Sequence, residues 1–263
     1  MRYTLLLLAS LLSGFLLAGC GGGSASRPNE PSAPAKSSSE TARARAKLHT
    51  DLGMAYLSGG QLTTAFDEAR IAISADSNYS AAHNLMGLTL MQMQDYPRAE
   101  EAFQQALRLA PDDAEINGNL GWFLCQTGRE ANAFAYFETA AKNPLYATPA
   151  RPLINASLCA SRIKDYKRAE DYINSALQLD PGNVYGKYVQ AAVYYQQGRL
   201  PEARARLTEV HRQADPTAAS TWLALLIERK SGDREAELRW AKQLRRTFAD
   251  SPEYKKLMQG SFD

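Results

Sequence analysis

The chain has 263 residues and a formal net charge of +2, so it lacks the basic excess that marks nucleic-acid-binding proteins, and we expect no nucleic-acid partner. Apolar residues make up 45% of the sequence, which excludes a disordered protein and is enough for a packed core. Three cysteines form neither a disulfide framework nor a zinc-binding set.

Residues 1–19 have the features of a signal peptide. Arg2 gives a short positive start, and the leucine-rich stretch after it is short for a membrane-spanning helix. The segment Leu17-Ala18-Gly19-Cys20 resembles a bacterial lipobox, in which a diacylglyceryl group is attached to the cysteine sulfur before cleavage. The resemblance implies a mature chain that begins at a lipidated Cys20 and is held permanently at a membrane. An ordinary secreted protein is the alternative.

Residues 21–23 are three glycines, and they bear on the choice of membrane. In Gram-negative bacteria an Asp directly after the lipidated cysteine is a signal for retention in the inner membrane, and that Asp is absent here. By this analogy we expect an outer-membrane protein whose folded part faces the periplasm.

Residues 20–40 are expected to form a lipidated, flexible tether. Gly, Ser, Pro and Ala dominate residues 21–40, and no larger apolar side chain is present to offset the entropy lost on ordering. A coil of this length spans about 25 Å, which lets the folded part reach off the membrane while staying near it.

From Thr41 onward the sequence repeats. Gly53, Gly87 and Gly121 are 34 residues apart, which is the period of the tetratricopeptide repeat. Alanines recur at the same interval: Ala65, Ala99 and Ala133, then Ala72, Ala106 and Ala140. Small residues let two antiparallel helices approach where they cross, and each helix pair buries its apolar face against its neighbours. We therefore predict that residues 41–263 form an all-α, right-handed superhelical solenoid of the tetratricopeptide type.

We divide this part into six helix-turn-helix units and a C-terminal cap. The third unit is two residues longer than 34, and the sixth is the most degenerate, because Pro252 comes about four residues late. We expect a longer final helix there, capped by residues 254–258. Pro97 and Pro201 suit the first turn of a second helix, where no backbone donor is needed. The units are 46–79, 80–113, 114–149, 150–183, 184–217 and 218–251.

No pattern of residues predicts catalysis or a metal site. His49 and His83 occupy equivalent places in successive repeats, and neither has Cys or carboxylate neighbours at metal-ligand spacing. There is no glycine-rich phosphate loop and no arrangement typical of a catalytic triad. We expect a protein that is not an enzyme and has no cofactor other than the covalent lipid on Cys20.

Cys125 and Cys159 lie on the predicted first helices of units three and four. An oxidising periplasm permits a disulfide, and adjacent first helices can approach closely enough for one. The two positions are not equivalent in the repeat, so two small buried apolar side chains are the alternative.

The first helices of such a solenoid line its concave face, which makes that face the candidate binding site. Its predicted side chains form a largely apolar groove with some polar groups, suited to an amphipathic helix or an extended apolar peptide. The predicted groove residues are Met54, Leu57, Leu88, Met91, Trp122, Ile154, Leu158, Arg162, Tyr185, Tyr188, Tyr195, Trp222 and Leu226.

Three further segments resemble the PilF/PilW pilotin family of type IV pilus biogenesis lipoproteins. Residues 117–125 (NGNLGWFLC) match the opening of that family's third repeat. Residues 143–146 (NPLY) resemble its loop insertion, and residues 244–254 (LRRTFADSPEY) resemble its closing pattern.

The resemblance implies a monomeric, chaperone-like adaptor at the outer membrane. Its partner would be a secretin subunit, from the ring-shaped channel through which the pilus emerges, or another pilus-assembly protein. Cys20 would provide the anchor and the concave groove would hold the partner. Two alternatives are a general envelope scaffold that docks peptidoglycan enzymes or proteases, and an enzyme of unrecognised chemistry.

Overall fold

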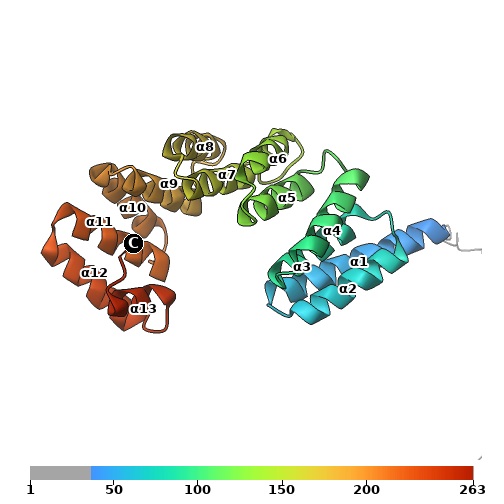
Figure 1. Ribbon diagram of the computed structural model, residues 1–263, viewed down its shortest axis with the longest axis horizontal. Coiled ribbons are helices and arrows are strands. Elements are labelled where there is room, and N and C mark those ends of the chain that lie inside the picture. The colour runs from blue at the N-terminus through green and yellow to red at the C-terminus, as the bar shows by residue number, and fades with distance from the viewer. Residues whose placement is uncertain (1–36, 263) are drawn as a thin grey trace, which may run out of the picture. The chain divides into compact units, whose positions relative to one another are not determined.

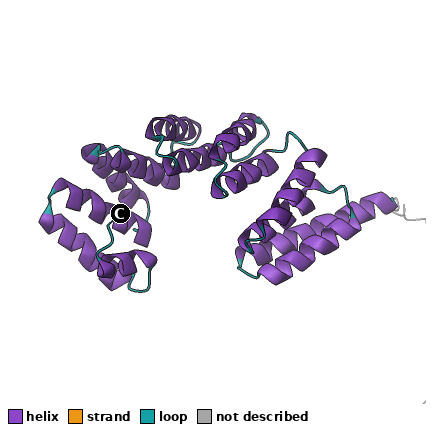
Figure 2. Ribbon diagram, in the orientation of Figure 1, coloured by secondary structure: helices purple, strands orange, loops and turns teal. Residues whose placement is uncertain are grey.

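The computed structural model describes residues 37–262, so the predicted signal peptide, Cys20 and most of the predicted tether lie outside the described residues. From Ser38 onward the chain forms one compact unit. Figure 2 shows helices and short loops, without a strand, throughout the described part. The helices labelled in Figure 1 are α1 (Ser38–Ser58), α2 (Leu62–Ala75), α3 (Ser80–Gln92), α4 (Tyr96–Leu109), α5 (Ala114–Gln126), α6 (Glu130–Lys142), α7 (Ala150–Arg162), α8 (Tyr166–Leu179), α9 (Val184–Gln196), α10 (Leu200–Gln213), α11 (Ala218–Ser231), α12 (Arg234–Thr247) and α13 (Pro252–Gln259).

The first twelve helices form six pairs, as the repeat predicts. The two helices of each pair contact each other, and each second helix contacts the first helix of the next pair. Successive first helices also contact one another, whereas no two second helices of the described pairs do. Because the first helices lie closer together, the stack curves toward them and they line its inner face.

The apolar core consists of clusters that extend across neighbouring pairs. Its largest cluster extends from Leu90 in α3 to Val193 in α9 and so spans four consecutive pairs. Phe103 and Phe137 are fully buried in it and lie against Gly87 and Gly121, where the two helices of a pair cross. No pair could bury these rings alone, so each depends on its neighbours for stability.

Local signals fix where the helices begin. Pro97 and Pro201 stand in the first turns of α4 and α10, as expected. Several helix starts, that of α4 among them, are capped by an Asp or Asn whose side-chain oxygen accepts a hydrogen bond from a backbone N–H of the first turn. These capping residues are Asp95, Asp113, Asp165, Asn183 and Asp233.

Two predicted boundaries were wrong. α1 begins at Ser38, so the last three residues of the predicted tether are helical. Glu40 lies in the first turn, where a negative charge is favourable. The final helix is not extended either, because α12 has 14 residues, the same length as α10. The late Pro252 instead begins a separate helix, α13, whose N-cap is Ser251.

Cys125 of α5 and Cys159 of α7 form a disulfide, with their Cα atoms 5.8 Å apart. Both residues are fully buried. Of the two possibilities that the sequence leaves open, the structure has the bridge. It links the first helices of two consecutive pairs.

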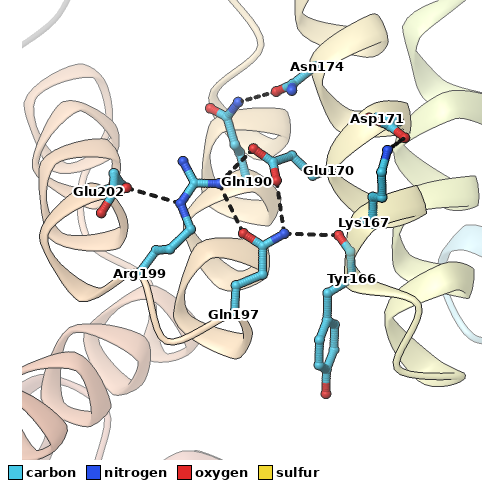
Figure 3. A network of polar contacts seen from close by, with 9 residues as sticks. All are labelled: Tyr166, Lys167, Glu170, Asp171, Asn174, Gln190, Gln197, Arg199 and Glu202. Atoms are coloured by element: carbon cyan, nitrogen blue, oxygen red, sulfur yellow. Dashed lines mark hydrogen bonds and ion pairs between the residues drawn. The ribbon is translucent and has the colours of Figure 1, made fainter.

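Polar contacts also join consecutive pairs (Figure 3). Arg199 donates a hydrogen bond to Glu170 Oε1 at 2.8 Å, and Gln197 Nε2 donates one to Glu170 Oε2 at 2.9 Å. Burial raises the pKa of the Glu170 carboxyl, but these hydrogen bonds outweigh it and the pKa falls below its usual value. The carboxylate is therefore ionised at neutral pH. Arg129 donates to Glu100 in the same way, at 2.7 Å, so this contact recurs along the stack.

Candidate protein-binding groove

The candidate groove is the inner face formed by the first helices α1, α3, α5, α7, α9 and α11. Nine of the thirteen predicted residues keep solvent-accessible surface. Met54, Arg162 and Tyr185 are exposed. The other six are half-buried, because one side of each packs on the core while the other faces solvent. These six are Leu88, Met91, Trp122, Leu158, Tyr188 and Tyr195.

Leu57 and Ile154 were wrongly predicted to be open groove residues. Leu57 is buried in a cluster with Leu85 of the next pair. Ile154 is buried in a cluster with Val189, again from the next pair. Each side chain thus packs in a cluster that joins its own pair to the following one.

Trp222 and Leu226 are also buried, and the prediction of an open position was wrong for both. They lie on the inner face of α11, as their helical positions require. Phe262, from the end of the chain, covers them together with side chains of α13. The groove is therefore open along α3, α5, α7 and α9 and covered at α11.

A cavity of about 440 Å³ opens beside the groove at the N-terminal ends of α7 and α9. Tyr185 and Ile154, both among the predicted residues, contribute to its wall. Arg151 and Leu179 line it as well. Leu179 was missed because it ends a second helix, whereas the groove was predicted from first helices alone. The lining combines apolar side chains with one basic residue, Arg151, and one acidic residue, Asp180, and such a mixture suits a peptide segment.

The tyrosines of α9 give this part of the groove a neutral, aromatic surface. The rings of Tyr185 and Tyr188 stack with centroids 6.1 Å apart. Burial, and to a smaller extent the neighbouring Tyr185 and Glu253, raises the pKa of the Tyr188 phenol. Burial alone raises that of Tyr195. Both phenols therefore remain protonated and can donate hydrogen bonds at physiological pH.

Within residues 37–262 no three His, Cys, Asp or Glu side chains are grouped in a way that could hold a metal ion. His49 instead lies 2.6 Å from Glu68 Oε2, in the contact between α1 and α2. No helix of this part of the chain is long and apolar enough to cross a bilayer. The open apolar and aromatic side chains described above are of the kind that bind a polypeptide.

Comparison with known proteins agrees with this architecture. Residues 84–152 and 164–226 match sequence profiles of the tetratricopeptide repeat. The type IV pilus assembly protein PilF of Pseudomonas aeruginosa is 24% identical over 206 residues, which cover 78% of this chain and 82% of PilF.

Two solved structures have the same fold. The crystal structure of PilW, described as a widely conserved type IV pilus biogenesis factor, is 27% identical with a TM-score of 0.74, over 81% of this chain and 98% of PilW. The structure of P. aeruginosa PilF has a TM-score of 0.70 at 22% identity, over 85% of this chain and all of PilF. The chain is thus a tetratricopeptide-repeat protein, homologous in sequence and in structure to the type IV pilus biogenesis proteins PilF and PilW.

Proposed function

We propose that this protein is an adaptor without catalytic activity, anchored by lipid to the outer membrane and facing the periplasm. It binds a subunit of the type IV pilus secretin and promotes the localisation, assembly or stability of that channel. Homology to PilF and PilW supports a role in type IV pilus biogenesis. The observation that carries the adaptor role is the inner face of α3 to α9, where apolar and aromatic side chains remain open along consecutive pairs.

The proposed compartment is supported by two features. Residues 17–20 resemble a lipobox, and the buried disulfide between Cys125 and Cys159 fits an oxidising environment such as the periplasm. Mass spectrometry of the mature protein tests the anchor. We expect an N-terminal Cys20 carrying acyl chains, and an unmodified N-terminus would refute the anchor.

Replacing Tyr185 by serine should weaken binding of the secretin by about 1 kcal/mol or more, or about fivefold in affinity, because exposed aromatic side chains dominate such contacts. Tyr185 is 55% exposed, so its removal leaves the core intact. Affinity is measured by surface plasmon resonance with purified secretin periplasmic domains, after circular dichroism has shown normal helix content.

Leu238→Ser is the matched control, since Leu238 is also 55% exposed but lies on the second helix α12. We expect it to bind like the unaltered protein. If Tyr185→Ser binds normally, this part of the groove does not hold the secretin.

Deletion of the gene separates the proposal from the scaffold alternative. Loss of twitching motility and of secretin multimers is expected. Altered cell shape with normal secretin multimers would instead favour a scaffold that docks peptidoglycan enzymes or proteases, and would contradict the proposed function.

A further inference from the structure

One position on the inner face is open in five units and closed in the sixth. If repeat geometry alone decided, the residue at this position would be equally exposed to solvent in all six units. The first five residues at this position are exposed or half-buried, whereas the sixth, Leu226, has only 9% of its surface exposed. In chain order the position is occupied by Met54, Leu88, Trp122, Leu158, Ala192 and Leu226.

The end of the chain provides the cover. α13 contacts α11 and α12, and Phe262 lies just beyond it. The ring of Phe262 stacks on the indole of Trp222, with centroids 5.7 Å apart and planes 12° apart. The guanidinium carbon of Arg229 lies 3.7 Å from the centroid of the Phe262 ring. Trp222 and Arg229 are two turns apart on α11, so the groove face itself forms the slot that receives this ring.

The covering segment packs on one side only, through Tyr254, Leu257 and Phe262. α13 has eight residues, none of them buried, and Met258 is 68% exposed. A helix shorter than about 12 residues is marginal by itself. α13 lies against α11 and α12, and side chains of the segment also share a packed cluster with Tyr195 of α9. Because it follows the last pair, residues 252–262 can leave the groove without separating any two units of the stack.

We propose that the inner face of α11 is a binding site for a partner's short amphipathic helix that carries an aromatic residue just beyond its end. Residues 252–262 fill this site until the partner displaces them. The aromatic ring is recognised by stacking on Trp222 and by the cation of Arg229, and the apolar side of the helix covers Leu226. The inference rests on the proposed use of the groove for a protein segment, though not on the identity of that partner.

The segment itself supplies the probe for a test. A fluorescent peptide with the sequence of residues 251–263 is added to the full chain and to two variants, and binding is followed by fluorescence anisotropy. Phe262→Ala removes the ring from the aromatic slot, so that the segment competes less well with the added peptide for the face of α11, and Met258→Ala is the control on the exposed side of α13. We expect the peptide to bind Phe262→Ala about tenfold or more tightly than the unaltered chain or the control. A peptide with Ala in place of Phe should not bind.

Equal binding to all three proteins, or binding to none, would overturn the proposal. Hydrogen exchange on the unaltered chain gives a second result that needs no variant to fold. The amides of residues 252–262 should exchange about tenfold or more faster than those of α12, because they open locally. Equal protection of α13 and α12 would make the segment a fixed part of the fold and would also refute displacement. Neither result depends on the secretin, so failure here leaves the binding test at Tyr185 unaffected.

Discussion

At Gly121 a hydrogen atom in place of a side chain sets how closely α5 and α6 approach. A Cβ at this position would lie 2.9 Å from ring atoms of Phe137 and 3.2 Å from the carbonyl oxygen of Ala133. Phe137 is fully buried and the oxygen belongs to a helix backbone, so neither can move aside easily. Three residues earlier, a Cβ at Gly118 would meet only the Cβ of Ala140, at 4.0 Å. Gly121 recurs at the 34-residue interval, and the structure shows why glycine is needed there.

Gly121→Ala should therefore lower the free energy of unfolding by about 1–3 kcal/mol, because it overpacks the helix crossing. Gly118→Ala, in the same helix, should raise it by up to about 1 kcal/mol, because alanine favours the helical state. Urea denaturation followed by circular dichroism measures both. Equal effects of the two changes would contradict the close approach at Gly121.

For single residues of the groove, the repeat pattern predicts the position on the helix but not always the exposure to solvent. Leu158 and Leu226 occupy equivalent positions, and the repeat pattern predicts both to be open. Leu158 is open, but Leu226 is covered by the segment that contains Phe262. That segment lies outside the six units, so no 34-residue pattern contains it. Leu57 was predicted wrongly for another reason. It is buried in one cluster with Leu85 of the next pair, and that packing depends on the angle between pairs, which the sequence does not specify.

At the scale of the elements, the turns between the two helices of each pair share one backbone conformation. In all six turns the equivalent residue is in the left-handed region. Four of them are glycines, which adopt this region at no steric cost, whereas Gln94 and Lys164 have φ values of 64° and 60°. The turn is therefore imposed on two residues that disfavour it, by the pairing of the helices on either side.

Lys164→Gly should relieve this strain and raise the free energy of unfolding by about 0.5–1 kcal/mol, once the greater chain entropy of glycine is deducted. In the preceding turn, replacing a glycine by a residue with a side chain, Gly128→Ala, should lower the free energy of unfolding by about 1 kcal/mol. Thermal denaturation of the two variants compares these effects. A destabilising Lys164→Gly would show that the lysine has a structural role that outweighs its strain.

At the two ends of the repeat array the structure departs from the predicted boundaries. The pairs from α3 to α10 follow from the spacing of glycine, alanine and proline. α1 extends eight residues before the first predicted unit, which begins at residue 46, because no earlier unit constrains its start. α13 was not predicted as a separate helix. Its sequence signals are Pro252 and the N-cap Ser251, but the late position of Pro252 was interpreted as the end of a longer α12.

For the whole molecule, stability depends on contacts between neighbouring pairs, and the disulfide strengthens one such junction. Cys125 and Cys159 close a loop with a sequence separation of 34 across the third and fourth pairs. The sequence could not settle this bond, because the two-residue insertion shifts the repeat register between the two cysteines. Only the packing of α5 on α7 brings them together.

Replacing both cysteines by alanine should lower the free energy of unfolding by about 3–4 kcal/mol, because a loop of this length then regains its freedom in the unfolded chain. Urea denaturation measures the change. Reductant should act only slowly on the folded protein, because both cysteines are fully buried. Two titratable thiols in the protein unfolded without reductant would contradict the bridge.

Photo-crosslinking in living cells tests most directly whether the inner face of the stack holds the secretin. A benzoyl-phenylalanine placed at Leu158, in the open part of the groove, is compared with one at Leu238, on a second helix. The account predicts that the secretin subunit is crosslinked from position 158 and not from position 238. Crosslinks to the secretin from position 238 alone, or crosslinks from position 158 only to other proteins, would contradict it.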